Sequence, residues 1–170
     1  PPLYAHGHLD ALSFTLSVAG EEFFVDPGTY LYHSGGKWRR YFRSTAAHNT
    51  IRINATELSE QTGDFMFGKP YRITEHALRT EGNTVIWRGG HDAYQRLANP
   101  VDHLRQVDVD FVGATLTIND TLTSNGPFAG ELFFHLHPLC KVSMDNTTVT
   151  LTRQEVVLQM TIDPRLTLQA

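Results

Sequence analysis

The strict alternation of apolar and polar residues is the feature that most limits what this chain can fold into. In the stretch LSFTLSV, residues 12–18, leucine, phenylalanine and valine occupy every even position, and serine and threonine occupy every odd one. Successive side chains of a β-strand point to opposite faces of the sheet. The pattern therefore predicts a strand that buries one face and exposes the other.

Similar short runs recur along most of the chain, separated by turn signals such as EGN, SNGP and DN. A 3.6-residue apolar period over the length of a helix is almost absent, and only short helical turns are expected near residues 35–44. Many short strands with frequent turns predict an all-β fold, an antiparallel β-sandwich of two stacked sheets, formed by residues 1–170 as a single domain. Further strands are predicted at residues 22–28, 49–54, 71–78, 84–89, 104–112, 114–122, 130–138, 148–153 and 156–162.

Charge and cysteine content narrow the classes of function. The formal net charge is -4 and the pI is about 6.1, so neither nucleic acid nor an anionic membrane is expected as the main partner. Cys140 is the only cysteine, which rules out an intrachain disulfide and a thiolate metal cluster. No apolar run approaches the roughly 20 residues that a membrane-spanning helix needs.

The stretch HGHLD, residues 6–10, concentrates polar side chains where a strand is predicted to begin. If its backbone is extended, His6, His8 and Asp10 share one face. Such a face is consistent with a metal site, a catalytic site or an ordinary polar edge. The spacing alone does not separate these three interpretations.

A metal site would need a further ligand from elsewhere in the chain. Asp26 in VDPG and His48 in AHNT are candidates, because each lies where a predicted strand meets a loop. Two imidazoles and a carboxylate suit zinc. A cupin-like metalloenzyme also begins from HxH on a strand, but the glutamate expected a few residues later is missing here.

Several ordered blocks of the sequence resemble the heparinase II/III-like domain of bacterial polysaccharide lyases. The resemblance is dense in HGHLD, DPGTYLY and WRRYFRSTAAHNT, and looser in RGGHDAYQRL and DHLRQVDVD and in ELFFHLHP further on. It implies an antiparallel β-sandwich that follows an N-terminal α/α toroid, with an acidic polysaccharide bound between the two. Only the β part is matched, so we expect this chain to be a portion of a longer bacterial enzyme, periplasmic or secreted.

The resemblance also implies roles for individual residues. His8, Asp26 and His48 match the positions at which the family holds a structural zinc, and His6 matches the histidine that faces the substrate. A tyrosine after the DPG block takes part in catalysis in several members. Tyr41 is the first choice for that role, with Tyr30 and Tyr32 as alternatives.

Lyases of this kind cleave uronic-acid polymers by β-elimination, in which a base removes the C5 proton and the oxygen at C4 departs. The substrate carboxylate must be neutralised while this happens. The basic run KWRRYFR offers Lys37, Arg39, Arg40 and Arg43 for that purpose, and Trp38 for stacking on a sugar ring.

Because the resemblance assigns the principal base to the toroid, we expect the 170-residue chain to fold and bind zinc with little or no lyase activity. The main alternative is a non-catalytic carbohydrate-binding or scaffold module with the same fold. Asn49, directly after His48, is open to two interpretations: it caps a turn, or it contacts sugar.

Overall fold

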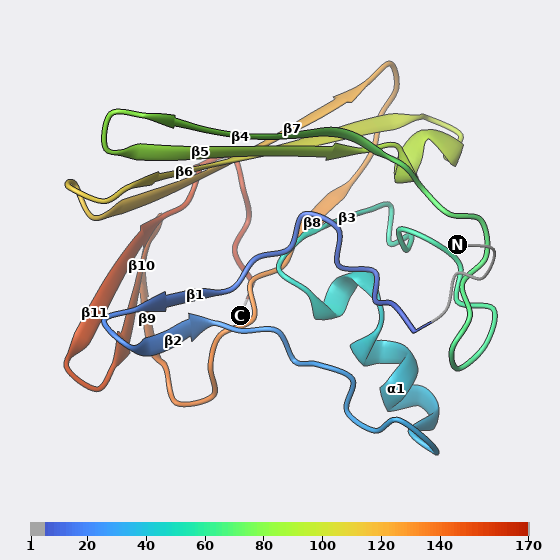
Figure 1. Ribbon diagram of the computed structural model, residues 1–170, viewed down its shortest axis with the longest axis horizontal. Helices are drawn as coiled ribbons and strands as arrows, with labels where there is room; N and C mark the ends of the chain where they lie inside the picture. Colours follow the sequence, from blue (N-terminus) through green and yellow to red (C-terminus); the bar gives the residue numbers. More distant parts are fainter. Residues whose placement is uncertain (1–5, 170) are drawn as a thin grey trace.

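A four-stranded antiparallel sheet forms one layer of the computed structural model, which describes residues 6–169 (Figure 1). Its strands run in the order β4 (Ile73–Glu81), β5 (Thr84–His91), β6 (Val101–Asp110) and β7 (Thr115–Ser124). Each strand pairs with the next one along the chain, so short connections are sufficient. This sheet is the most regular part of the molecule.

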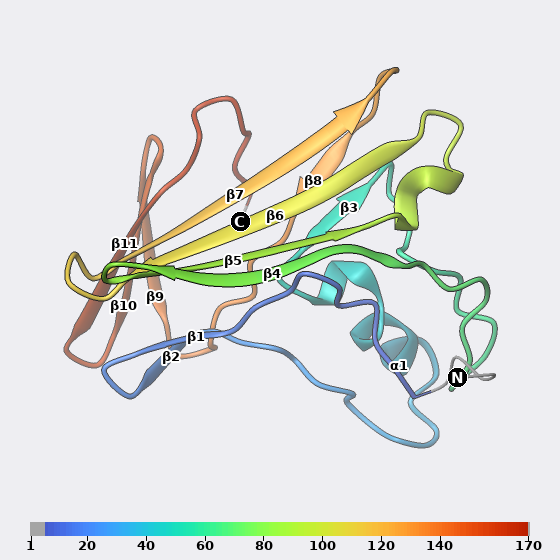
Figure 2. The same cartoon turned by 45° about the horizontal axis from the view of Figure 1, so that its top comes forward.

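The second layer is divided into small sheets that lie beneath the first (Figures 1 and 2). One hairpin is formed by β1 (Leu16–Val18) and β2 (Glu21–Phe24). A separate pair is formed by β3 (Ile51–Ile53) and β8 (Gly130–Leu132).

Residues 133–137, directly after β8, connect these two small sheets. The Phe133 N–H donates to the Thr50 carbonyl beside β3. Further along, the Val25 N–H donates to the His135 carbonyl, and an isolated antiparallel bridge joins Phe24 to Leu136. One segment therefore bonds to the β3 side and the β2 side in turn.

Three more strands, β9 (Lys141–Asp145), β10 (Thr148–Arg153) and β11 (Val156–Thr161), form an antiparallel sheet in the order β11-β10-β9. It lies near the β1–β2 hairpin in both views (Figures 1 and 2). The helical content is small and consists of α1 (Gly36–Phe42) with the short turns η1 (Thr45–Ala47) and η2 (Ala93–Arg96).

Two apolar clusters form the core. The first cluster lies around β3 and η2, and its buried members are Leu9, Ile51, Ile53, Leu58, Ala93, Tyr94 and Val101. The second joins the β1–β2 hairpin to the three-stranded sheet, and its buried members are Phe23, Phe24, Val149, Leu151 and Ile162. Each cluster packs elements from distant parts of the sequence together, which is the main source of stability for such short strands.

The predictions of an all-β antiparallel fold, two packed layers and a helical turn near residues 35–44 are confirmed. The strand predicted at residues 12–18 is limited to β1, because the chain turns before it: the Ser13 N–H donates to the Asp10 carbonyl, and Leu12 has a φ of 62°. β9 was not predicted. Among residues 6–169, no helix is both long enough and apolar enough to cross a membrane.

Candidate metal centre and its surroundings

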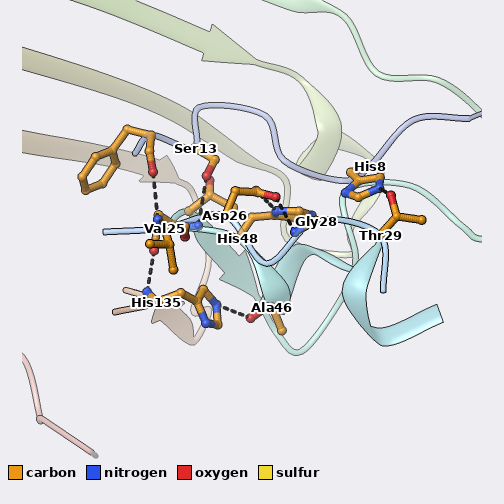
Figure 3. A network of polar contacts seen from close by, with 12 residues as sticks. His8, Ser13, Val25, Asp26, Gly28, Thr29, Ala46, His48 and His135 are labelled. Atoms are coloured by element: carbon orange, nitrogen blue, oxygen red, sulfur yellow. Dashed lines mark hydrogen bonds and ion pairs between the residues drawn. The ribbon is translucent and has the colours of Figure 1, made fainter. Parts of the chain in front are cut away.

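His8, Asp26 and His48 come together in the structure and are called the metal cluster below (Figure 3). One potential ligand atom from each residue lies within 4.8 Å of the other two. The His48 Nδ1 is 2.6 Å from the Asp26 Oδ2, and the rings of His8 and His48 are 5.2 Å apart between centroids. No other group of three or more such residues with this spacing occurs in the part of the chain described, residues 6–169.

The backbone around each of the three residues is held separately. Leu9, next to His8, is buried, and its N–H donates to the Arg43 carbonyl. Asp26 follows β2, and its Oδ1 accepts a hydrogen bond from the Gly28 N–H. His48 ends the short turn η1, where its N–H donates to the Thr45 carbonyl. The cluster is thus assembled from three chain segments that are distant in sequence.

The donor set suits a metal ion such as zinc, which binds imidazole nitrogen and carboxylate oxygen. His48 is fully buried, and its Nε2 has no hydrogen-bond partner in the described structure. Burying a polar nitrogen without a hydrogen-bond partner costs free energy, and a cation bound to this nitrogen would offset that cost. Burial, followed by the nearby His48, lowers the pKa of His8, which favours the neutral ring that metal binding requires.

The expectation that His6, His8 and Asp10 share one strand face is wrong. Residues 6–10 form no strand, and His6 has a φ of 62°. His8 turns toward the metal cluster, with its Nε2 3.0 Å from the Thr29 Oγ1. His6 contacts a different group, and Asp10 is exposed. An unpaired irregular segment has no two-residue side-chain period, so the spacing argument does not apply to it.

His6 forms a pair with Tyr32. The Tyr32 hydroxyl lies 3.0 Å from the His6 Nδ1, and both side chains are exposed. Phe65 packs against both rings, and the Arg39 guanidinium carbon lies 5.3 Å from the centroid of the Tyr32 ring. Tyr30 stacks on Phe42 instead. Of the three candidate tyrosines, Tyr32 is the one whose hydroxyl contacts His6.

Tyr41 lies on a different surface, an open pocket of about 760 Å³ beside α1. Lys37 and Arg40 line the same pocket, opposite residues that follow β3. The side chain of Trp38 is 50% exposed and contacts Tyr41 edge to face. No contact joins Tyr41 to His6 in the described part of the chain.

Arg39 and Arg43, predicted to bind a substrate carboxylate, point into the protein. They are only 3% and 1% exposed. Arg39 donates to the carbonyls of Leu31 and Asp64, and Arg43 donates to those of Gly7, Gly63 and Asp64. These contacts favour a role in holding loops together over the predicted role in substrate binding. Arg43 is the C-cap residue of α1, and the two faces of this helix separate Arg39 and Arg43 from Lys37 and Arg40.

Sequence reasoning missed a buried polar network on β5, β6 and β7. Arg105 is fully buried and forms an ion pair with Asp120, and His103 bonds to the same carboxylate at 2.7 Å. Burial alone would raise the pKa of Asp120, but the hydrogen bonds from His103 and Arg105 outweigh burial and lower it. The alternation of β6 was an available signal, because it places His103 and Arg105 on the same face as the buried Val101.

The identity of the domain follows from its sequence as a whole. A search of curated proteins found no match. A family model described as "Heparinase II/III-like, C-terminal" matches residues 1–165, nearly the whole chain. The fold agrees with the β-sandwich that the sequence blocks implied. The chain therefore belongs to the heparinase II/III-like C-terminal domain family, and its context is that of a polysaccharide lyase.

Proposed function

We propose that this domain forms one wall of the substrate cleft of a lyase that cleaves uronic-acid polysaccharides by β-elimination. The observation that carries the proposal is the hydrogen-bonded pair of His6 and Tyr32 next to the metal cluster. The segments of residues 6–8 and 29–32 are joined by two hydrogen bonds, one between His8 and Thr29 and one between His6 and Tyr32. Fixing His8 in the cluster therefore also limits where His6 and Tyr32 can move.

The elimination needs a base near C5, an acid near the leaving oxygen, and donors that stabilise charge on the substrate carboxylate. Both polar groups of the pair are exposed, so a sugar can reach them from solvent. In this proposal the Tyr32 hydroxyl, rather than that of Tyr41, exchanges a proton with the substrate, and His6 accepts or returns it. The catalytic groups of the partner toroid domain would complete the site.

Lys37, Arg40 and Trp38 remain the exposed candidates for contact with an acidic sugar. No ion pair engages Lys37 or Arg40 in the described structure, so their charges are available to a carboxylate or sulfate. Tyr41 is adjacent to them and supplies a further aromatic surface. These residues would bind the polymer, while the His6–Tyr32 pair would take part in its cleavage.

Zinc is the metal proposed for the cluster, with His8, Asp26 and His48 as ligands. When bound, it would cross-link three separated chain segments and add its binding free energy to folding. We expect zinc to raise the melting temperature of the metal-free chain, and His48→Ala to abolish that rise. Metal analysis of chelator-free protein provides an independent measurement, and an absence of zinc there would contradict this part of the proposal.

The catalytic part is tested in the longer enzyme that carries the toroid. The unsaturated product absorbs in the ultraviolet, so turnover of alginate or a glycosaminoglycan can be followed directly. We expect Tyr32→Phe to lower kcat by at least about a hundredfold, the lower end of general acid–base contributions. Tyr41→Phe should mainly raise KM, and equal kcat losses in the two variants would reject the choice of Tyr32.

A carbohydrate-binding module without catalytic participation is the second candidate, favoured by the exposed aromatic and cationic side chains beside α1. It predicts that the isolated domain binds an acidic oligosaccharide with useful affinity. It also predicts that Tyr32→Phe in the longer enzyme leaves kcat unchanged.

A further inference from the structure

Asn49 is fully buried directly beside a residue of the metal cluster. His48 has an extended backbone, with φ of -123° and ψ of 160°. Asn49 follows it at the centre of a tight turn, in which the Thr50 N–H donates to the His48 carbonyl at 2.8 Å. Its complete burial leaves no surface for a sugar, which removes one of the two interpretations of this residue.

The carboxamide of Asn49 joins three other segments. Its Nδ2 donates to the Phe14 carbonyl at 2.8 Å and to the Val25 carbonyl at 3.0 Å. Its Oδ1 accepts a hydrogen bond from the His135 N–H at 2.5 Å. Because Val25 directly precedes Asp26, this one side chain sets the distance between the segments that carry two of the three candidate ligands.

The backbone of Asn49 is fixed as well. Its N–H donates to the Ser13 Oγ at 3.0 Å, and its carbonyl accepts from the Arg105 Nη1 at 2.6 Å. The same Arg105 nitrogen donates to the Leu12 carbonyl at 2.7 Å. Ser13 and Leu12 belong to the segment that follows His8, so the third ligand-bearing part of the chain is connected to the same residue.

We infer that Asn49 is a positioning residue for the metal cluster, which it holds in a binding arrangement before any cation is present. The inference rests on the zinc site of the proposed function. Every polar group of Asn49 forms a hydrogen bond. Two partners, Ser13 and Phe14, lie in the segment after His8, and Val25 directly precedes Asp26. The other two, Arg105 and His135, belong to β6 and to residues 133–137. Groups that hydrogen-bond directly to metal ligands typically contribute 10–100-fold to metal affinity, and we expect Asn49, which bonds to the segments that carry the ligands, at the lower end of that range.

The experiment measures the zinc dissociation constant of the chain and the rise in melting temperature that zinc produces. Asn49→Ala should weaken zinc binding by at least about tenfold and reduce the zinc-dependent rise. Val149→Ala is the matched control, because it removes buried apolar volume in the second core cluster without removing a hydrogen bond to a segment that carries a candidate ligand. It should lower the melting temperature of the metal-free protein and leave the zinc affinity unchanged.

Asn99→Ala is a second control, since it removes an asparagine whose Nδ2 donates to the Pro127 carbonyl, away from the cluster. If Asn49→Ala does not fold, Ser13→Ala takes its place, because it removes only the acceptor of the Asn49 N–H. Unchanged zinc affinity in the folded variant overturns the inference and leaves the zinc site standing. Absence of zinc binding by the unmodified chain overturns the zinc site itself and this role of Asn49 with it.

Discussion

The four-stranded sheet and the layer beneath it are stabilised in different ways. In the sheet, β4 to β7 pair along most of their length, and each strand bonds to its neighbour through the backbone. In the lower layer the strands around the metal cluster are only three or four residues long. Buried side chains such as Arg43, Asn49 and Arg105 bond to loop carbonyls there. The irregular segments of the lower layer carry the candidate functional groups. Because these segments lack the backbone hydrogen bonds of paired strands, buried polar side chains bond to their carbonyls instead.

The largest test of this contrast uses two arginines of the same sheet. Arg105→Met leaves the buried Asp120 without its cation and two carbonyls without their donor. We expect it to reduce the free energy of unfolding by about 3–5 kcal/mol. Arg79→Met, which removes an exposed pair with Glu81, should cost less than about 1 kcal/mol. If urea unfolding shows similar losses in the free energy of unfolding for the two variants, the contrast between buried and exposed arginines is wrong.

A second test compares Arg43, the C-cap residue of α1, with Arg40 inside this helix. Arg43→Met removes charged hydrogen bonds to the carbonyls of Gly7, Gly63 and Asp64, and we expect a loss of about 2–3 kcal/mol. Arg40→Met alters an exposed residue of the pocket and should change stability by no more than about 0.5 kcal/mol. Urea unfolding of both variants measures this difference. A result in which Arg40→Met is the more destabilising would show that the helix faces are wrongly assigned.

The pH dependence of stability offers a third test. Burial, followed by the neighbouring His103, lowers the pKa of His91 from 6.5 to about 3. Between these values the unfolded chain binds a proton that the folded chain excludes, so stability falls as the pH falls. The slope should reach about 1.4 kcal/mol per pH unit. In urea unfolding between pH 6 and 4, His91→Phe should flatten this slope.

The control for that series is Tyr94→Phe, which alters an adjacent buried ring. Burial raises the pKa of Tyr94, so this residue does not titrate in acid and the slope should persist in the variant. An unaltered slope in His91→Phe would assign the acid sensitivity to another group.

The smallest expected effect concerns the regular sheet. Gly82 lies in the two-residue connection between β4 and β5 and has a φ of 60°, with open space where a side chain would begin. Gly82→Ala should therefore cost only the backbone strain, about 1 kcal/mol. Gly63→Ala, at a glycine with open space and no positive φ, should be nearly neutral. Thermal unfolding of both variants measures the difference. Equal effects would mean that the hairpin geometry does not depend on Gly82.

The same contrast explains what could be predicted from the sequence. Alternation predicted β5, β6, β7, β10 and β11 within a few residues, because two-residue periodicity is a property of the strand itself. β9 was missed because its alternation is short: only Val142 and Met144 are apolar in its five residues, and the structure leaves all five exposed.

The site itself was partly predictable. Sequence blocks nominated His8, Asp26 and His48, and the structure brings them together. The basic run suggested a surface, whereas Arg39 and Arg43 donate to loop carbonyls inside the protein. Such contacts depend on the positions of loops that are distant in sequence, and a local sequence pattern does not indicate those positions.

Residues 133–137 have a consequence for the order in which the domain can assemble. The candidate ligands lie within the first 48 residues, yet the segment that bonds to both β2 and Asn49 comes some 85 residues later. A chain folded only as far as β7 carries every candidate ligand but lacks this closing segment. Any cation bound at the metal cluster should therefore be held tightly only once β8 and the residues after it have joined the fold.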